Sequence, residues 1–172
     1  MVPATAPAAA AAPGAAPAPA PGAAAAPGAA PAPAPGAAPA PRPFTSDGCS
    51  LFPDGTAARP GLWCRCCFEH DVAYWRGGTE AERLGADEAL RECVFGRTRD
   101  RALADAMFAG VRAGGAPVFP SWYRWAYGWP YGRGYAPVSA AEALQLDDRL
   151  RTYSKQHPAG YCAPAGASGR RR

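Results

Sequence analysis

Long apolar runs and a strong charge imbalance are missing from this 172-residue chain, and lysine is nearly so. No segment reaches the ~18 uninterrupted apolar residues of a membrane-spanning helix. A basic start followed by an apolar run, the pattern of a signal peptide, is not visible either. The formal net charge is only +4, and Lys155 is the only lysine. No nucleic-acid-binding motif accompanies the arginines, so no nucleic-acid partner is expected.

Charge and large apolar side chains are also missing from the first part of the chain. Residues 1–43 are almost only Ala, Pro and Gly, with no charge before Arg42. Such a segment buries too little apolar surface to offset its loss of entropy on folding. We therefore expect a disordered tether over 1–43, a folded domain over 44–137, and a C-terminal helix with a flexible basic tail over 138–172.

The cysteines are concentrated in the expected folded part. An even number in a small domain is typical of disulfides and of an oxidising compartment. A secreted or periplasmic location follows as the expectation. The alternative is a reduced protein that uses cysteines for zinc. The six cysteines are Cys49, Cys64, Cys66, Cys67, Cys93 and Cys162.

Start and stop signals predict a mainly α fold. A helix begins near Pro60, which suits a first helical position, and ends before Gly77 and Gly78. Thr79 with Glu82 has the form of a capping box, which begins a second helix that ends near residue 96. Two further helices are expected, a third over 101–112 and a last, short one over 140–153.

The first two expected helices are joined by a very short turn, so they should pack antiparallel. His70 lies about 10.5 Å of helical rise before Gly77, and Asp87 lies about 12 Å after Thr79. The two side chains therefore fall at nearly the same level and can form a His–Asp dyad. The stripes expected to face each other are Trp63, Cys67, His70 and Tyr74 on one helix and Leu84, Asp87, Leu90 and Val94 on the other.

Neighbouring residues of a helix point about 100° apart, so His70 and Asp71 serve two adjacent sites. Asp87 can hold the His70 imidazole in one tautomer, which leaves the opposite ring nitrogen as a general base. Asp71 can help to bind a hard cation such as calcium, which prefers carboxylate and carbonyl oxygens. The turn-rich loop over 47–55 can supply carbonyls if a Cys49–Cys67 disulfide holds it near Asp71.

The adjacent cysteines of the first helix need different partners because they point in different directions. Cys66 lies about 6 Å of rise before His70, and Cys93 lies about 9 Å beyond Asp87, toward the same end of the pair. Their levels agree within about 3 Å, so a Cys66–Cys93 disulfide is expected. Cys67 is then free for Cys49. The two remaining cysteines, Cys64 and Cys162, could pair with each other.

Three motifs resemble the secreted phospholipases A2. CCFEHDVAY, residues 66–74, is similar to the CC-x-x-H-D-x-C-Y helix of that family, and ADEALREC, residues 86–93, is similar to its second helix. DGCS, residues 47–50, looks like the calcium loop of the bacterial and fungal members. The family's cysteines at two of these positions are replaced here by Ala73 and Ala86, as expected where one disulfide has been lost.

The resemblance implies a calcium-dependent hydrolysis of a phospholipid ester. The histidine takes a proton from water, which attacks an ester carbonyl polarised by calcium. The expected partner is a phospholipid or membrane surface, and no stable protein partner is evident. The implied catalytic residues are His70, Asp87 and Tyr74, and the implied calcium ligands are Asp71, Gly48, Ser50 and Asp47.

Other interpretations remain open at this point. A non-catalytic lipid- or protein-binding module of the same fold would keep the motifs, but a degenerate copy usually loses one of the functional residues. A zinc site is disfavoured because two adjacent cysteines and a histidine on one helix match no common ligand spacing. The aromatic segment 122–135 either lies at a membrane interface or covers the small helical core, and the second role is favoured.

Overall fold

The computed structural model describes residues 39–158 and 161–162, which contain four α-helices and no strand. They are α1 (Cys64–Arg76), α2 (Glu80–Thr98), α3 (Arg101–Gly114) and α4 (Ala140–Gln156). The mainly helical fold class is thereby confirmed. Most of the expected tether, over 1–38, and the basic tail after Cys162 lie outside the described residues.

Side-chain caps set where three of the helices begin. Thr79 and Ser139 each form a full capping box, with Glu82 and Glu142 respectively, and Asp100 caps α3. The expected start of the first helix at Pro60 is wrong, since α1 begins at Cys64. The Trp63 backbone amide and indole instead bond the carbonyls of the preceding loop, which keeps these residues in turns.

One core cluster is built from aromatic rings of distant segments. Trp75 of α1 packs with Trp125 and Trp129, and all three are almost fully buried. Leu146 of α4 belongs to the same cluster, so α4 packs into the core although the sequence analysis places it outside 44–137. The backbone amide of Arg42 bonds the carbonyl of Gly128 at 2.7 Å, so the described fold extends to residues before 44.

A second core cluster lies between α1, α2 and α3 and contains two disulfides. The expected Cys49–Cys67 and Cys66–Cys93 bridges are both present. The last two cysteines pair as well, and the Cys64–Cys162 bridge joins the first residue of α1 to the chain beyond α4. None of the six cysteines is a free thiol, so the zinc interpretation is wrong.

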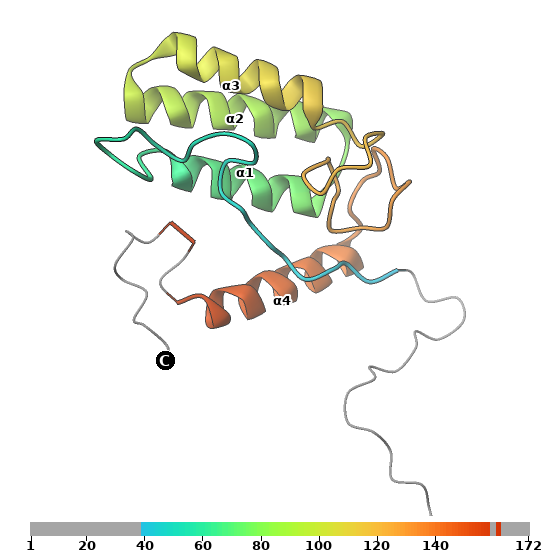
Figure 1. Cartoon of the computed structure of the whole chain (residues 1–172). Helices are drawn as coiled ribbons and strands as arrows, with labels where there is room; N and C mark the ends of the chain where they lie inside the picture. The colour runs from blue at the N-terminus through green and yellow to red at the C-terminus, as the bar shows by residue number, and fades with distance from the viewer. Residues whose placement is uncertain (1–38, 159–160, 163–172) are drawn as a thin grey trace, which may run out of the picture. The chain divides into compact units, whose positions relative to one another are not determined.

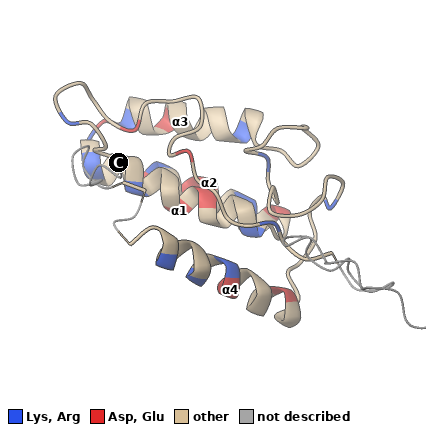
Figure 2. Ribbon diagram, turned by 60° about the horizontal axis from the view of Figure 1, so that its bottom comes forward, with Lys and Arg blue, Asp and Glu red and all other residues tan. Residues whose placement is uncertain are grey.

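Figure 1 shows α1, α2 and α3 stacked side by side, with α4 on the opposite side of α1 from α3. Basic residues occur on each of the four helices rather than on one of them (Figure 2). Within the described part of the chain, no helix is long and apolar enough to cross a membrane.

Candidate active site

His70 and Asp87 are in direct contact. The Nε2 atom of His70 lies 2.8 Å from Oδ1 of Asp87, and the His70 side chain is only 8% exposed. Because a carboxylate accepts hydrogen bonds, Nε2 carries the proton and Nδ1 is left as the basic ring nitrogen. The Tyr74 ring lies beside the imidazole, with a centroid distance of 4.1 Å.

Asp87 is completely buried and is surrounded by donors. The Tyr74 hydroxyl donates to Oδ1 at 2.7 Å, and Nη1 of Arg112 donates to Oδ2 at 2.8 Å. Burial by itself raises the pKa of Asp87, but the hydrogen bonds from His70, Arg112 and Tyr74 outweigh it and lower the pKa. Asp87 is therefore a carboxylate that keeps the imidazole oriented.

Arg83, rather than the expected Leu84, is the buried residue in the first turn of α2. Leu84 is 40% exposed, whereas Arg83 is 2% exposed, so the expected stripe was wrong by one residue. The Arg83 guanidinium donates to the Tyr74 hydroxyl, to the Tyr135 hydroxyl and to the carbonyls of Val111 and Arg112. This charged side chain is tolerated inside the domain because its donors are satisfied.

The Tyr74 hydroxyl connects Asp87 with Arg83, because it donates to the first and accepts from the second. Burial, and next the charge of Asp87, raise the pKa of Tyr74, so its hydroxyl stays protonated and acts as a donor. The ring also sets the path of the chain after α3, because a Cβ atom at Gly115 would lie 2.6 Å from Tyr74 Cε1. Glycine at 115 therefore permits the close approach of this backbone to Tyr74.

The loop before α1 lies against Asp71. The Ser46 hydroxyl donates to Oδ2 of Asp71 at 2.6 Å, and the Cys49–Cys67 disulfide fastens the loop one helical turn away. Gly48 has a φ of 77°, in the left-handed region that glycine adopts without strain. A Cβ atom there would also collide with the Asp54 carboxylate, so a replacement of Gly48 would displace the side chain that accepts from the Cys49 amide.

Asp71 stands in an electronegative environment. Burial is the main cause that raises its pKa to about 7; the Ser46 hydrogen bond lowers it, and the charges of Asp47 and Asp54 raise it again. Asp71 forms no ion pair with any basic side chain among the described residues. A cation bound next to Asp71 would therefore stabilise its ionised form.

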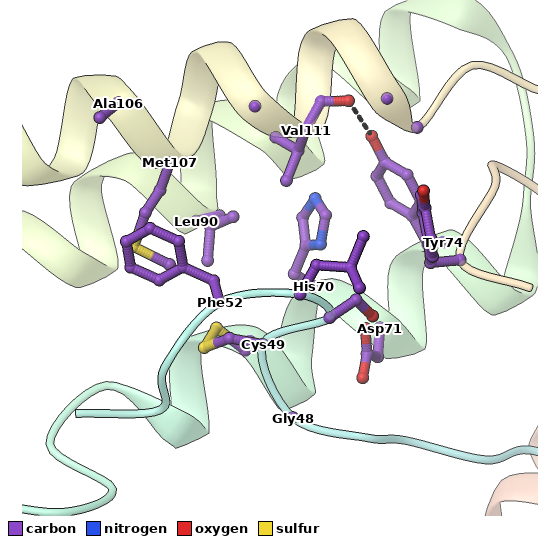
Figure 3. Close-up of a pocket in the computed structure, with 17 residues that line it drawn as sticks. Gly48, Cys49, Phe52, His70, Asp71, Tyr74, Leu90, Ala106, Met107 and Val111 are labelled. Carbon is purple, nitrogen blue, oxygen red and sulfur yellow. Dashed lines mark hydrogen bonds between the residues drawn. A yellow bond between two sulfur atoms is a disulfide. The ribbon is translucent and has the colours of Figure 1, made fainter. Parts of the chain in front are cut away.

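A pocket of about 290 Å³ opens between this loop, α1 and α3 (Figure 3). His70 and Asp71 line it, together with the loop residues Gly48 and Ser50. Apolar side chains form the rest of the wall, and α3 contributes a row of small residues. The apolar wall includes Phe52, Leu90, Met107 and Val111, and the row of small residues is Ala106, Gly110 and Gly114.

All the site residues expected from the sequence lie close to this pocket. Asp47 lies in a neighbouring hollow that Asp71 and Ser50 also line, and its Oδ1 accepts from the Ser50 hydroxyl at 2.7 Å. Sequence reasoning missed Ser46, Arg83 and Arg112. Only Arg83 had a usable signal, because it precedes Asp87 by four residues on one helix.

Leu51 was also missed. Its φ of 60° is rare for a non-glycine residue, and its side chain is 80% exposed at the pocket wall. Such a conformation is costly and tends to occur at functional sites. The aromatic segment contributes to the core, as favoured from the sequence, since Trp125 and Trp129 are core residues, whereas Trp122 is 66% exposed.

Comparisons of this chain with protein-family models, with curated proteins and with solved structures gave no match. The motifs and the geometry of the site are therefore the basis for assigning a function.

Proposed function

We propose that this chain is a phospholipase A2-like, calcium-dependent hydrolase of phospholipid esters. One observation carries the proposal: a buried carboxylate, Asp87, holds His70 at the wall of an apolar pocket that Asp71 and the 48–50 loop also line. A base, a candidate cation site and an apolar cavity are the parts that hydrolysis of a lipid ester requires.

The proposal takes α1 and α2 as an antiparallel pair that carries a His–Asp dyad. Three links support this pairing. Cys66 is joined to Cys93, His70 contacts Asp87, and Tyr74 contacts Arg83. Later positions on α1 contact earlier positions on α2, as expected for helices that run in opposite directions.

In the proposed mechanism, Nδ1 of His70 accepts a proton from a water molecule in the pocket, whose oxygen adds to the ester carbonyl. The ester C–O bond then breaks, and the imidazolium returns the proton to the departing alkoxide. Asp87 stabilises the imidazolium that forms and keeps the ring from turning. Tyr74 and Arg112 hold Asp87 ionised and in place. The apolar wall accommodates an acyl chain and excludes bulk water from the reacting ester.

The residues of the loop fit a calcium ion. Asp71 would supply a buried carboxylate without a basic partner, and Gly48 and Ser50, which line the same pocket, would supply backbone carbonyls. Asp47 can add a side-chain oxygen from the neighbouring hollow. These are hard oxygen donors, which suit calcium. Among the described residues, no group of three or more His, Cys, Asp or Glu side chains could hold a metal ion by itself. Bound there, calcium supplies a Lewis acid for the ester carbonyl.

Disulfides support a secreted or periplasmic location for such an enzyme, because bridges of this kind form and persist in oxidising compartments. A non-catalytic lipid- or protein-binding module is the second candidate. The ordered contact between His70 and Asp87 favours the enzyme, since binding alone does not need an oriented base.

The first test is an assay of the oxidised protein on phosphatidylcholine vesicles. We expect release of fatty acid with millimolar calcium and none with excess chelator, since weak calcium sites are common outside cells. Asp71→Asn should abolish calcium binding measured by calorimetry. Asp105→Asn, an exposed change on α3, should not alter it. Cleavage that is equal in chelator, or absent with calcium, would contradict the proposal.

A second test fills the pocket without touching the dyad. A Cβ atom at Gly110 meets nothing within 4 Å, so Gly110→Leu can begin a side chain there without strain and adds bulk to the pocket lining. We expect kcat/KM for a long-chain phospholipid to fall at least ~10-fold, because the added leucine takes up space that the acyl chain of the substrate would occupy. Gly85→Leu, in open space on α2 outside the pocket, is the matched control. Equal activity of both variants would show that the substrate does not use this pocket.

A further inference from the structure

A second, basic hollow lies outside the pocket of His70. Its volume is about 530 Å³, and two arginines, Arg42 and Arg124, line it. Ser121, Trp122 and Tyr131 complete the part of the lining that matters here. None of the described residues that line it is acidic, so the two guanidinium groups share one cavity without a carboxylate.

Arg124 is a buried cation with unused donors. It is 6% exposed, and one hydrogen bond, from Nη2 to the carbonyl of Trp129 at 2.8 Å, uses one of its five N–H groups. No ion pair reaches Arg124 or Arg42 within the described residues. Burial, and then the charge of Arg42, lower the pKa of Arg124. A buried charge of this kind is costly unless an anion compensates it.

Ser121 provides an independent observation at the same place. Its Oγ atom is buried and has no hydrogen-bond partner among the described residues, yet the residue lines the hollow. A buried hydroxyl is normally satisfied, and an unsatisfied one costs free energy. A turn of the Ser121 side chain toward the hollow would let this hydroxyl donate to an acceptor bound there.

We propose that this hollow binds a phosphate group, either of a lipid headgroup or of a soluble phosphate. Guanidinium forks match phosphate oxygens in pairs, and a serine hydroxyl adds a third donor. Thr45, Trp122 and Tyr127 line both this hollow and the one that contains Asp71, so a bound phosphate lies beside the candidate cation site. Binding here needs no hydrolysis, and the inference stands whether or not the proposed function is correct.

The test titrates inorganic phosphate into the full, oxidised chain without calcium and follows binding by calorimetry and by amide chemical shifts. We expect saturable binding, weakened about 10-fold or more in Arg42→Gln and in Ser121→Ala, because each removes one charge-assisted or hydroxyl contact. Arg42 is exposed, and Ser121→Ala removes an unsatisfied hydroxyl, so both variants should fold. Arg97→Gln, an exposed arginine at the end of α2, is the charge-matched control.

Vesicles distinguish the two sources of phosphate. If vesicles that contain phosphatidylglycerol displace inorganic phosphate and phosphatidylcholine vesicles do not, the site takes an anionic headgroup. If neither displaces it, the site takes a soluble phosphate. An absence of saturation by phosphate, or equal affinity in wild type, Arg42→Gln, Ser121→Ala and Arg97→Gln, would overturn the proposal.

Discussion

His70→Gln is expected to lower kcat about 10²–10⁴-fold, which is the usual contribution of a general base. The Gln side chain can still donate to Asp87, so the buried carboxylate stays satisfied and the fold should be kept. KM should change little, because the imidazole acts on water rather than on the acyl chain. Kinetics on phospholipid vesicles, with circular dichroism to verify folding, make the measurement.

The chain offers a matched control for this substitution, because it has only two histidines. His157 lies just after α4, stacks on Tyr153 and is exposed. His157→Gln should leave kcat unchanged. Retention of more than about a tenth of the activity in His70→Gln would show that another group is the base.

The helices and two disulfides of this fold could be predicted because their causes are local. Thr79 with Glu82 is a complete capping signal, and α2 begins where that signal predicts. The Cys66–Cys93 bridge followed from helical rise along a pair joined by a short turn. Levels along a helix accumulate only small errors, whereas facing directions shift by about 100° per residue. That difference explains why the level of Asp87 was predicted correctly, whereas Leu84 was predicted to face α1 and Arg83 does so instead.

Features that depend on distant segments could not be predicted. Arg112 reaches Asp87 from α3, and its contact requires the packing of α3 on α2, which no spacing in the sequence reports. The Cys64–Cys162 bridge spans 98 residues, and the sequence left it only as an open possibility for the two remaining cysteines. The basic hollow is similar, because Arg42 and Arg124 come from segments far apart in the sequence.

Asp87→Ala should lower the free energy of unfolding by about 3–5 kcal/mol, the usual cost of removing one partner of a buried charged network. The change leaves the His70 ring, the Arg112 guanidinium and the Tyr74 hydroxyl without their shared acceptor, which is fully buried. Such a loss is a large part of the ~5–15 kcal/mol that stabilises a typical domain. Urea unfolding of the oxidised protein measures it, and Asp87→Asn, which keeps the volume, serves if the alanine variant does not fold.

An exposed aspartate of the same domain provides the control for this stability effect. Asp147 bonds Arg76 at 2.7 Å, but its side chain is 47% exposed, so Asp147→Ala should cost less than about 1 kcal/mol. Both substitutions remove one carboxylate paired with an arginine, but Asp87 is buried and also accepts hydrogen bonds from His70 and Tyr74. Equal losses in the two variants would mean that Asp87 is not the centre of a stabilising network.

Acidification tests the same network through the ionisation of Asp87. Burial opposes ionisation, but the hydrogen bonds from His70, Arg112 and Tyr74 lower the pKa of Asp87 in the folded state. A lowered pKa gives stability that is fully present above the unfolded pKa, about 3.9, and is lost as the pH falls through the folded pKa. The stability difference between wild type and Asp87→Asn should therefore shrink as the pH is lowered below about 4. A difference that grows on acidification would mean that Asp87 is protonated in the folded protein, and it could then not serve as the acceptor that fixes the tautomer of His70.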